Sequence, residues 1–352
     1  MKRPWAKAQV LAPAGTARRA EGVPSAALAI DGLTVSFPGP SGRLRVLEEV
    51  GFSIARGEIV GLVGESGSGK SVTALAAMRL LAPTARVDAG SVRLGERDLA
   101  TLSKAELLRA RGAEIAMIFQ EPMTSLNPLF RAGFQIGETL EAHLGLSRAE
   151  ARTRAVELMH AVGIPAPEQR VDDYPHQLSG GMRQRVMIAM AMACRPKVLI
   201  ADEPTTALDV TIQAQILALV RRLRDDTGMG VLLITHDLGV VAGMANRVVV
   251  MYAGLVMEEA PVRTLFAAPL HPYTRLLLKS IPRIGTKAAR LHQIAGTTPP
   301  PSRFPSGCRF HPRCPDATDQ CRSAVPALET LADGRRVRCW RAHETGLVSM
   351  AR

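Results

Sequence analysis

The stretch GESGSGKS, residues 64–71, follows an apolar run at residues 59–63 that predicts a short buried strand. It matches the pattern G-x-x-x-x-G-K-[ST], whose glycines leave backbone N–H groups free to surround phosphate oxygens. Lys70 adds a positive charge, Ser71 adds a hydroxyl that can bind Mg²⁺, and a helix beginning near Lys70 would point its positive end at the anion. This order favours a nucleoside triphosphate site over a flexible glycine turn. The residues assigned to the phosphates are Gly64, Glu65, Ser66, Gly67, Ser68, Gly69, Lys70 and Ser71.

Two acidic residues follow a second apolar stretch, VLIA at residues 198–201, which predicts another buried strand. Asp202 is placed to hold Mg²⁺, directly or through water, and Glu203 to polarise the attacking water. A general base of this kind accelerates a reaction by about 10² to 10⁴. The alternative is an acidic cap ahead of a helix. Because the pair occurs together with a phosphate loop, we favour the catalytic interpretation.

A third apolar strand, at residues 231–234, ends in Thr235, His236 and Asp237. A lone histidine after a strand is most often a loop or capping residue. Here it follows another strand of a phosphate-binding sheet, so we expect His236 to orient the outermost phosphate and the water.

The stretch LSGGMRQR, residues 178–185, predicts a second anion site. Ser179, Gly180 and Gly181 precede a helix expected at residues 182–193, whose free N–H groups and positive end attract an anion. A chain that already has a phosphate loop gains little from a second site for its own nucleotide. The nucleotide of a neighbouring copy is the better candidate.

These four motifs, in this order, resemble the ATP-binding cassette (ABC) ATPases, in which the LSGGQ-type motif closes over ATP held by the opposite subunit. The resemblance covers residues 28–278. It implies ATP and Mg²⁺ as cofactors and an α/β fold of the P-loop NTPase type. It further implies a flanking antiparallel β subdomain and an inserted helical subdomain.

The same resemblance implies roles for three further residues. Gln120 matches the glutamine that links Mg²⁺ and water to the transport partner. Asp209, in TALD at residues 206–209, matches a loop that runs across the dimer. Phe37 matches the aromatic residue that stacks on adenine, although an aromatic side chain at a strand end is commonly part of a core. Met182 stands where many relatives have glutamine, and we expect the contact to survive because Ser179 and both glycines are retained.

The hydrophobic pattern outlines the same organisation. Strand signals at residues 28–37 and 46–54 predict a sheet beside the nucleotide, and helical signals at residues 134–143 and 148–162 predict a helical subdomain at about 121–180. A helix at residues 212–224 completes an alternating α/β core. We therefore expect a mobile basic tail at residues 1–27, the nucleotide-binding domain at 28–278 and a C-terminal extension at 279–352.

Composition narrows the class of protein. With 352 residues, 47% of them hydrophobic, the chain can bury one large core and a small second unit. Its apolar runs are far shorter than the roughly 20 residues that cross a bilayer, and no secretory signal peptide is expected. The net charge of +12 allows a nucleic-acid partner, but only 4% of residues are aromatic and the basic residues are scattered. Attraction to an anionic membrane face is an equal explanation.

The C-terminal part of the chain, beginning shortly before the extension, contains HPYT at residues 271–274 and GCRFHPRCP at residues 307–315. Both stretches resemble the ATP-binding subunit of oligopeptide and dipeptide ABC importers. Four cysteines lie there, Cys308, Cys314, Cys321 and Cys339, while Cys194 is expected to be an ordinary buried thiol.

Three states of these four thiols remain open. A reducing cytoplasm argues against disulfides, and the C-x-x-C pair common in zinc sites is absent. Four thiolates can hold an iron–sulfur cluster, and the resemblance implies a [4Fe-4S] cluster that staples the extension. Zinc and unconnected reduced thiols are the alternatives. The nearby arginines could offset the charge of a cluster or simply form a solvated basic face; they are Arg309, Arg313, Arg322 and Arg338.

The sequence thus predicts the ATPase motor of a peptide importer, peripheral on the cytoplasmic face of the membrane. Its expected partners are a second ABC ATPase subunit, two transmembrane permease subunits and an extracytoplasmic substrate-binding protein, without nucleic acid. The alternatives are a soluble ABC ATPase that acts on nucleic acid and an importer motor for another solute, such as nickel or glutathione.

Overall fold

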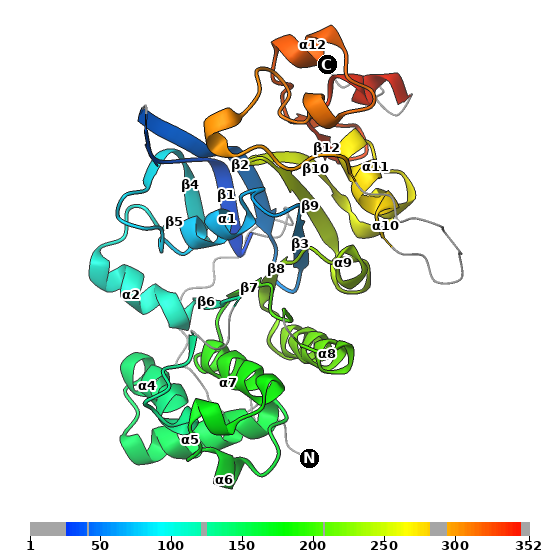
Figure 1. Ribbon diagram of the computed structural model, residues 1–352. Helices are drawn as coiled ribbons and strands as arrows, with labels where there is room; N and C mark the ends of the chain where they lie inside the picture. The colour runs from blue at the N-terminus through cyan, green and yellow to red at the C-terminus, as the bar shows by residue number, and fades with distance from the viewer. Residues whose placement is uncertain (1–25, 41, 121–124, 207, 282–293, 346–352) are drawn as a thin grey trace, which may run out of the picture. The chain divides into compact units, whose positions relative to one another are not determined.

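A computed structural model describes residues 26–40, 42–120, 125–206, 208–281 and 294–345 (Figure 1). The tail expected at residues 1–27 lies almost entirely outside the described residues. By its internal contacts the chain divides into two compact units. The first is built mainly from residues 102–231, and the second from residues 28–54, 58–101 and 232 onward. Each unit joins segments that are distant in sequence.

The first unit contains a parallel pair of strands, β6 and β7, whose register places Ile118 opposite Ala201. All five residues of β7 are buried, as expected for a strand covered on both faces. The bounds in this unit are α2 (Lys104–Ala113), β6 (Ile115–Ile118), α4 (Ala132–Leu144), α5 (Arg148–Ala161), α6 (Pro167–Arg170), η2 (Pro175–Gln177), α7 (Gly180–Met192), β7 (Val198–Asp202) and α8 (Val210–Thr227). Strand β8 (Gly230–Ile234) continues into the second unit.

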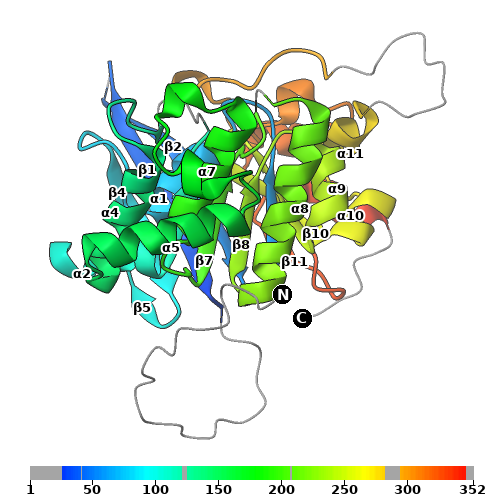
Figure 2. The same ribbon diagram turned by 90° about the horizontal axis from the view of Figure 1, so that it is seen from below.

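Local sequence explains where these helices begin and end. Helix α5 starts with a reciprocal capping box between Ser147 and Glu150. Helices α4 and α8 stop at Gly145 and Gly228, which adopt the left-handed conformation that glycine tolerates best. Helices α4, α5 and α7 pack against one another, and Figures 1 and 2 show them in green as one layer.

The second unit contains two sheets. One is antiparallel, in the order β2-β1-β4-β5, and the other runs β11-β12-β10-β9-β3-β8, with β3 parallel to β9. The strand bounds are β1 (Leu28–Gly39), β2 (Gly42–Ile54), β3 (Ile59–Val63), β4 (Arg86–Leu94), β5 (Arg97–Asp98), β9 (Arg247–Tyr252), β10 (Leu255–Pro261), β11 (Glu329–Thr330) and β12 (Arg336–Val337).

The C-terminal extension is part of this second unit, because β12 pairs antiparallel with β10 and places Val337 opposite Glu258. In Figure 1 the extension runs from orange to red. The helices of the unit are α1 (Lys70–Ala77), α9 (Leu238–Met244), α10 (Val262–Ala267), α11 (Pro272–Lys279), η3 (Pro301–Arg303), η4 (His311–Arg313), α12 (Asp319–Ser323) and η5 (Trp340–Thr345).

Most elements predicted from the hydrophobic pattern are present. Strand β3 has the predicted bounds, and β1, β2, β7 and β8 overlap their predictions. Helices α4, α5 and α8 also overlap theirs, while α7 begins at Gly180 and so includes both glycines of its motif. No strand occurs among the described residues between 125 and 178, as predicted. None of the described helices combines the length and apolar character needed to span a membrane.

Candidate functional site

The phosphate loop joins β3 to α1 and has a conformation that only glycine permits at two positions. Gly64 has a φ of +154°, and a Cβ placed there would lie 2.1 Å from the carbonyl oxygen of Met251. Gly69 has a φ of +103° and caps the N-terminus of α1. The loop therefore packs against the end of β9 by backbone contact, with no room for a side chain at Gly64.

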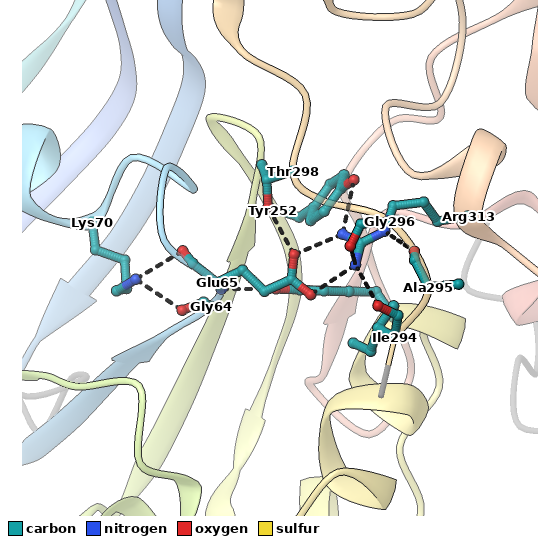
Figure 3. A network of polar contacts seen from close by, with 10 residues as sticks. Gly64, Glu65, Lys70, Tyr252, Ile294, Ala295, Gly296, Thr298 and Arg313 are labelled. Carbon is teal, nitrogen blue, oxygen red and sulfur yellow. Dashed lines mark hydrogen bonds and ion pairs between the residues drawn. The ribbon is translucent and has the colours of Figure 1, made fainter. Parts of the chain in front are cut away.

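Lys70 points back into this loop (Figure 3). Its Nζ atom donates hydrogen bonds to the carbonyl oxygens of Gly64 and Glu65, at 2.8 and 3.0 Å. The Lys70 residue is 7% exposed and Ser68 is fully buried, whereas Ser71 is exposed at the first turn of α1. A buried ammonium, a helix N-terminus and an exposed hydroxyl are the groups that a triphosphate with Mg²⁺ requires.

Two other predicted residues belong to the same unit. Phe37 lies near the end of β1, half-buried, opposite Leu44 of β2. His236 follows β8 and is exposed, while its neighbour Asp237 caps α9 by accepting a hydrogen bond from Gly239 N at 2.7 Å. The roles assigned to Phe37 and His236 remain predictions.

The predicted carboxylates lie in the first unit. Asp202 ends β7 and is 4% exposed. Glu203 has a φ of +47°, a strained value for a residue with a side chain that often marks functional positions. Its Oε2 atom accepts hydrogen bonds from Gln120 Nε2 at 3.1 Å and from Thr206 Oγ1 at 2.9 Å. The structure thus brings Gln120 and Glu203 together and gives Glu203 one orientation.

The residues of the predicted second anion site form a capped helix N-terminus, which begins two residues earlier than expected. Ser179 caps α7 by accepting a hydrogen bond from Met182 N, and Gly180 is exposed. At Gly181 a Cβ would lie 2.9 Å from Ile212 Cγ2, so glycine lets α7 approach α8. Asp209 caps α8 by accepting a hydrogen bond from Ile212 N at 2.9 Å. A role for Asp209 opposite a second copy remains a prediction.

The four thiols of the extension converge on one cavity, which Cys308, Cys314, Cys321 and Cys339 line. None of them forms a disulfide. Burial raises the pKa of Cys308 and of Cys314 to about 11, so both are protonated thiols at neutral pH unless a cation displaces the proton. Among the described residues, no group of three or more His, Cys, Asp or Glu side chains is arranged to hold a metal ion.

The arginines near these thiols have partners of their own. Arg309 contacts the carbonyl oxygen of Ala253 and the Glu48 carboxylate. Arg338 donates to the carbonyl oxygens of Val256 and Pro326, at 3.0 and 3.1 Å. Arg309, Arg313 and Arg338 are therefore buried structural groups, whereas Arg322 is exposed. Cys194 is half-buried, and burial raises its pKa to about 11, as expected of an ordinary thiol.

Two family models match the chain. Residues 47–206 match the family described as ABC transporter, and residues 257–321 match that described as Oligopeptide/dipeptide transporter, C-terminal region. The dipeptide transport ATP-binding protein DppD of Escherichia coli K12 is 51% identical over 314 residues, covering 89% of this chain and 96% of the relative. This chain belongs to the ATP-binding proteins of the ABC transporter family.

Other members of the ABC family show the same similarity. The oligopeptide transport ATP-binding protein AppD of Bacillus subtilis 168 is 50% identical over 323 residues, covering 92% of this chain and 98% of AppD. Among solved structures, the dimeric ATP-binding cassette MJ0796 bound to ADP and Pi aligns with a TM-score of 0.61 at 30% identity. The alignment covers 67% of this chain and 99% of MJ0796, so the cassette fold is shown.

Sequence reasoning missed three residues that contact the phosphate loop. Tyr273, Thr298 and Arg313 all form hydrogen bonds to Glu65. Tyr273 belongs to HPYT and Arg313 to GCRFHPRCP, the two stretches on which the expected resemblance to peptide importers rests. The motifs were therefore visible in the sequence, but their contact with a loop more than 200 residues earlier was not.

Replacing Gly64 with alanine is expected to abolish nucleotide binding and to lower the unfolding temperature, because the new Cβ would lie 2.1 Å from the Met251 carbonyl oxygen. Gly32→Ala is the matched control, since Gly32 also has a positive φ, +59°, but no atom within 4 Å of the new Cβ. Gly32→Ala should lower the free energy of unfolding by only about 1 kcal/mol, through backbone strain. Titration with a fluorescent ATP analogue and thermal unfolding measure both effects, and equal losses in the two variants would contradict the steric explanation.

Proposed function

We propose that this chain is the ATP-hydrolysing subunit of a membrane importer for dipeptides or oligopeptides. The observation that carries the proposal is the glutamine-held carboxylate of Glu203, found in a chain that also has a complete phosphate loop. The peptide cargo is supported by DppD and AppD, whose names record dipeptide and oligopeptide transport. The matched C-terminal family also supports it.

Each of the predicted site residues has its own role in the proposed hydrolysis of ATP. Backbone N–H groups of the loop and the Lys70 ammonium bind the phosphates, and Ser71 and Asp202 offer the oxygen ligands that Mg²⁺ prefers. When bound, Mg²⁺ would neutralise part of the negative charge of the phosphates. Glu203, oriented by Gln120 and Thr206, accepts a proton from the attacking water. His236 is proposed to orient that water.

A second ATP-binding subunit completes the site in this proposal. The exposed N-terminus of α7, with Ser179 and Gly180, is free to face a nucleotide on a neighbouring copy or on a related chain. The dimeric form of MJ0796 supports such an arrangement. If dilute, unpaired chains hydrolysed ATP at the full rate of the concentrated protein, the shared site would be excluded.

We further propose that α4–α7 form the helical subdomain that contacts the permease. A groove in the first unit is lined by Phe134, by the acidic residues Glu141 and Asp172, and by three arginines, Arg131, Arg148 and Arg152. Asp172 pairs with Arg131 and Arg152, so part of this positive charge is already neutralised. Leu129, two residues before Arg131 in the chain, is 78% exposed, which is unusual for a large apolar side chain. A groove with an aromatic side chain and both signs of charge suits a cytoplasmic permease segment that carries apolar and charged side chains. Peripheral attachment to the membrane follows from this partner, as does an extracytoplasmic binding protein that supplies the peptide.

The four thiols are proposed to bind a [4Fe-4S] cluster, with zinc as the alternative. Their number and their convergence on one cavity support this proposal. In the present arrangement no three described ligands meet the geometry of a metal site, so binding would have to draw the thiols together. The expected role is structural, because Cys308 N already donates to Cys321 O at 2.8 Å within the same fold.

Glu203→Gln is expected to lower ATP hydrolysis by about a hundredfold while ATP binding is preserved, because glutamine keeps the shape but cannot accept the proton. Glu168→Gln, an exposed position in α6 of the same unit, is the control and should hydrolyse ATP at the normal rate. Phosphate release and binding of a fluorescent ATP analogue provide the two measurements. Normal turnover in Glu203→Gln would remove Glu203 from the mechanism.

Phe134→Ser is expected to reduce recovery of the chain with the membrane fraction, and peptide uptake, by about tenfold, because truncating an interface anchor costs more than 1 kcal/mol. Leu144→Ser is the matched control, because Leu144 lies at the other end of α4 and is 51% exposed. It should leave membrane recovery and peptide uptake unchanged. ATP hydrolysis by the isolated chain should be normal in both variants. Equal loss of recovery in the two variants would exclude the groove as the docking site.

Protein purified without oxygen is expected to contain iron and acid-labile sulfide, and Cys308→Ser should lose both. Cys194→Ser is the control, because Cys194 lies in the first unit and should not affect the metal content. Elemental analysis decides the outcome: stoichiometric zinc would replace the cluster proposal, and absence of both metals would assign four reduced thiols.

A further inference from the structure

Residues of the C-terminal extension contact the phosphate loop at the carboxylate of Glu65. Arg313 forms a bidentate ion pair with Glu65, with Nη1 2.6 Å from Oε2 and Nη2 3.1 Å from Oε1 (Figure 3). Thr298 Oγ1 donates a further hydrogen bond to Oε2 at 2.8 Å. The Arg313 side chain is 8% exposed, so the pair is shielded from solvent and stronger than a surface ion pair.

The backbone of Glu65 is held as firmly as its side chain. Its N–H donates to the hydroxyl of Tyr273 at 2.9 Å, and its carbonyl accepts a hydrogen bond from Lys70. Tyr273 is fully buried in α11, and His271 caps that helix by accepting from Tyr273 N at 3.0 Å. Burial lowers the pKa of His271 to about 3, so its imidazole is neutral and can accept.

A second arginine supports the loop indirectly, through the turn after β9. Arg309 contacts the carbonyl oxygen of Ala253, in the turn between β9 and β10. The next residue, Gly254, donates its N–H to the carbonyl oxygen of Ser68 at 2.9 Å. Arg309 and Arg313 both lie in the segment bounded by Cys308 and Cys314. This short segment therefore contacts the phosphate loop directly at Glu65 and indirectly at Ser68.

Aromatic packing fixes the segment in place. Phe310 is fully buried, with its ring centroid 5.2 Å from those of Tyr252 and Tyr273. The guanidinium of Arg313 lies over the Tyr252 ring, 5.7 Å from its centroid. The backbone of Arg313 is also held, because its N–H donates to Phe310 O at 3.0 Å. Arg313 is thus presented to Glu65 by a rigid support and not by a flexible tail.

A carboxylate inside a phosphate-binding loop is electrostatically unfavourable unless a cation neutralises it. Glu65 carries a negative charge on the loop that receives a polyanion, and like charges at close range weaken binding. Arg313 is the cation that both neutralises this carboxylate and fixes its direction. Its removal would leave the Glu65 charge next to the triphosphate and would free the loop residue whose carbonyl orients Lys70.

We propose that the segment from Cys308 to Cys314 is a brace for the phosphate loop, in which Arg313 is a positioning residue that acts through Glu65. ATP affinity therefore depends on the C-terminal extension, although the extension lies outside the cassette. The inference rests on ATP binding in the proposed function. It predicts that losing Arg313 weakens ATP binding chiefly through the uncompensated charge of Glu65.

The test measures ATP affinity in a double-mutant cycle on the full chain. Arg313→Gln is expected to raise the Kd for a fluorescent ATP analogue, and the KM for ATP, by about tenfold with a smaller change in kcat. Arg313→Lys keeps the positive charge but cannot donate two parallel hydrogen bonds to the carboxylate, so it should raise the Kd by only about threefold. The double variant Glu65→Gln/Arg313→Gln should bind ATP more tightly than Arg313→Gln alone, because the unpaired charge is gone.

Arg322→Gln is the matched control, since Arg322 lies in the same extension, is exposed, and pairs only loosely with Asp319 at 3.7 Å. It should bind ATP normally. A Kd for Arg313→Gln within about twofold of the unmodified chain would overturn the proposal, as would a double variant that binds no better than Arg313→Gln. If Arg313→Gln does not fold, Arg313→Lys decides, because an unchanged Kd in that variant would also overturn it. If the unmodified chain bound ATP but did not hydrolyse it, the proposed ATPase activity would be refuted. The comparison of Kd values between the variants would still test the role of Arg313.

Discussion

The contact between Gly64 and the Met251 carbonyl oxygen is the constraint on which the phosphate loop depends. It brings the loop against the end of β9, so the turn at Ala253 and Gly254 can hold Ser68 through a backbone hydrogen bond. With the loop fixed there, the Lys70 ammonium donates hydrogen bonds to the carbonyl oxygens of Gly64 and Glu65 and lies 3.4 Å from Ser68 Oγ. Backbone packing, more than any charge, sets the geometry of this part of the site.

The same constraint explains why the C-terminal extension is not an independent appendage. Strand β10 follows β9 directly, and its buried Glu258 accepts hydrogen bonds from Leu270 N and His271 N, both at 2.9 Å. This carboxylate anchors the start of α11, which delivers the hydroxyl of Tyr273 to the loop. A buried carboxylate is tolerated only when hydrogen bonds compensate its desolvation. Leu270 and His271, just before the extension, supply those bonds, and the extension itself contacts the phosphate loop through Thr298 and Arg313.

Several arginines of the second unit are committed to internal ion pairs. Arg247 pairs with Glu58 and Glu259, and Arg336 pairs with Glu259. Arg309 and Arg313 pair with Glu48 and Glu65. Arginine suits this role because its guanidinium group can form bidentate contacts with a carboxylate. Since each pair joins opposite charges, these residues do not account for the net charge of +12.

The sequence by itself determined the phosphate loop, the apolar strand that leads to Asp202 and Glu203, the helix that follows Ser179 and most of the strands of the sheets. Glycine spacing and apolar runs are local signals, and local backbone conformation follows from them. Only the tertiary structure decided that Arg313 and Tyr273 hold Glu65, that Gln120 holds Glu203, and that four cysteines line one cavity. Such contacts join residues far apart along the chain, and no local pattern encodes which distant side chain will arrive there.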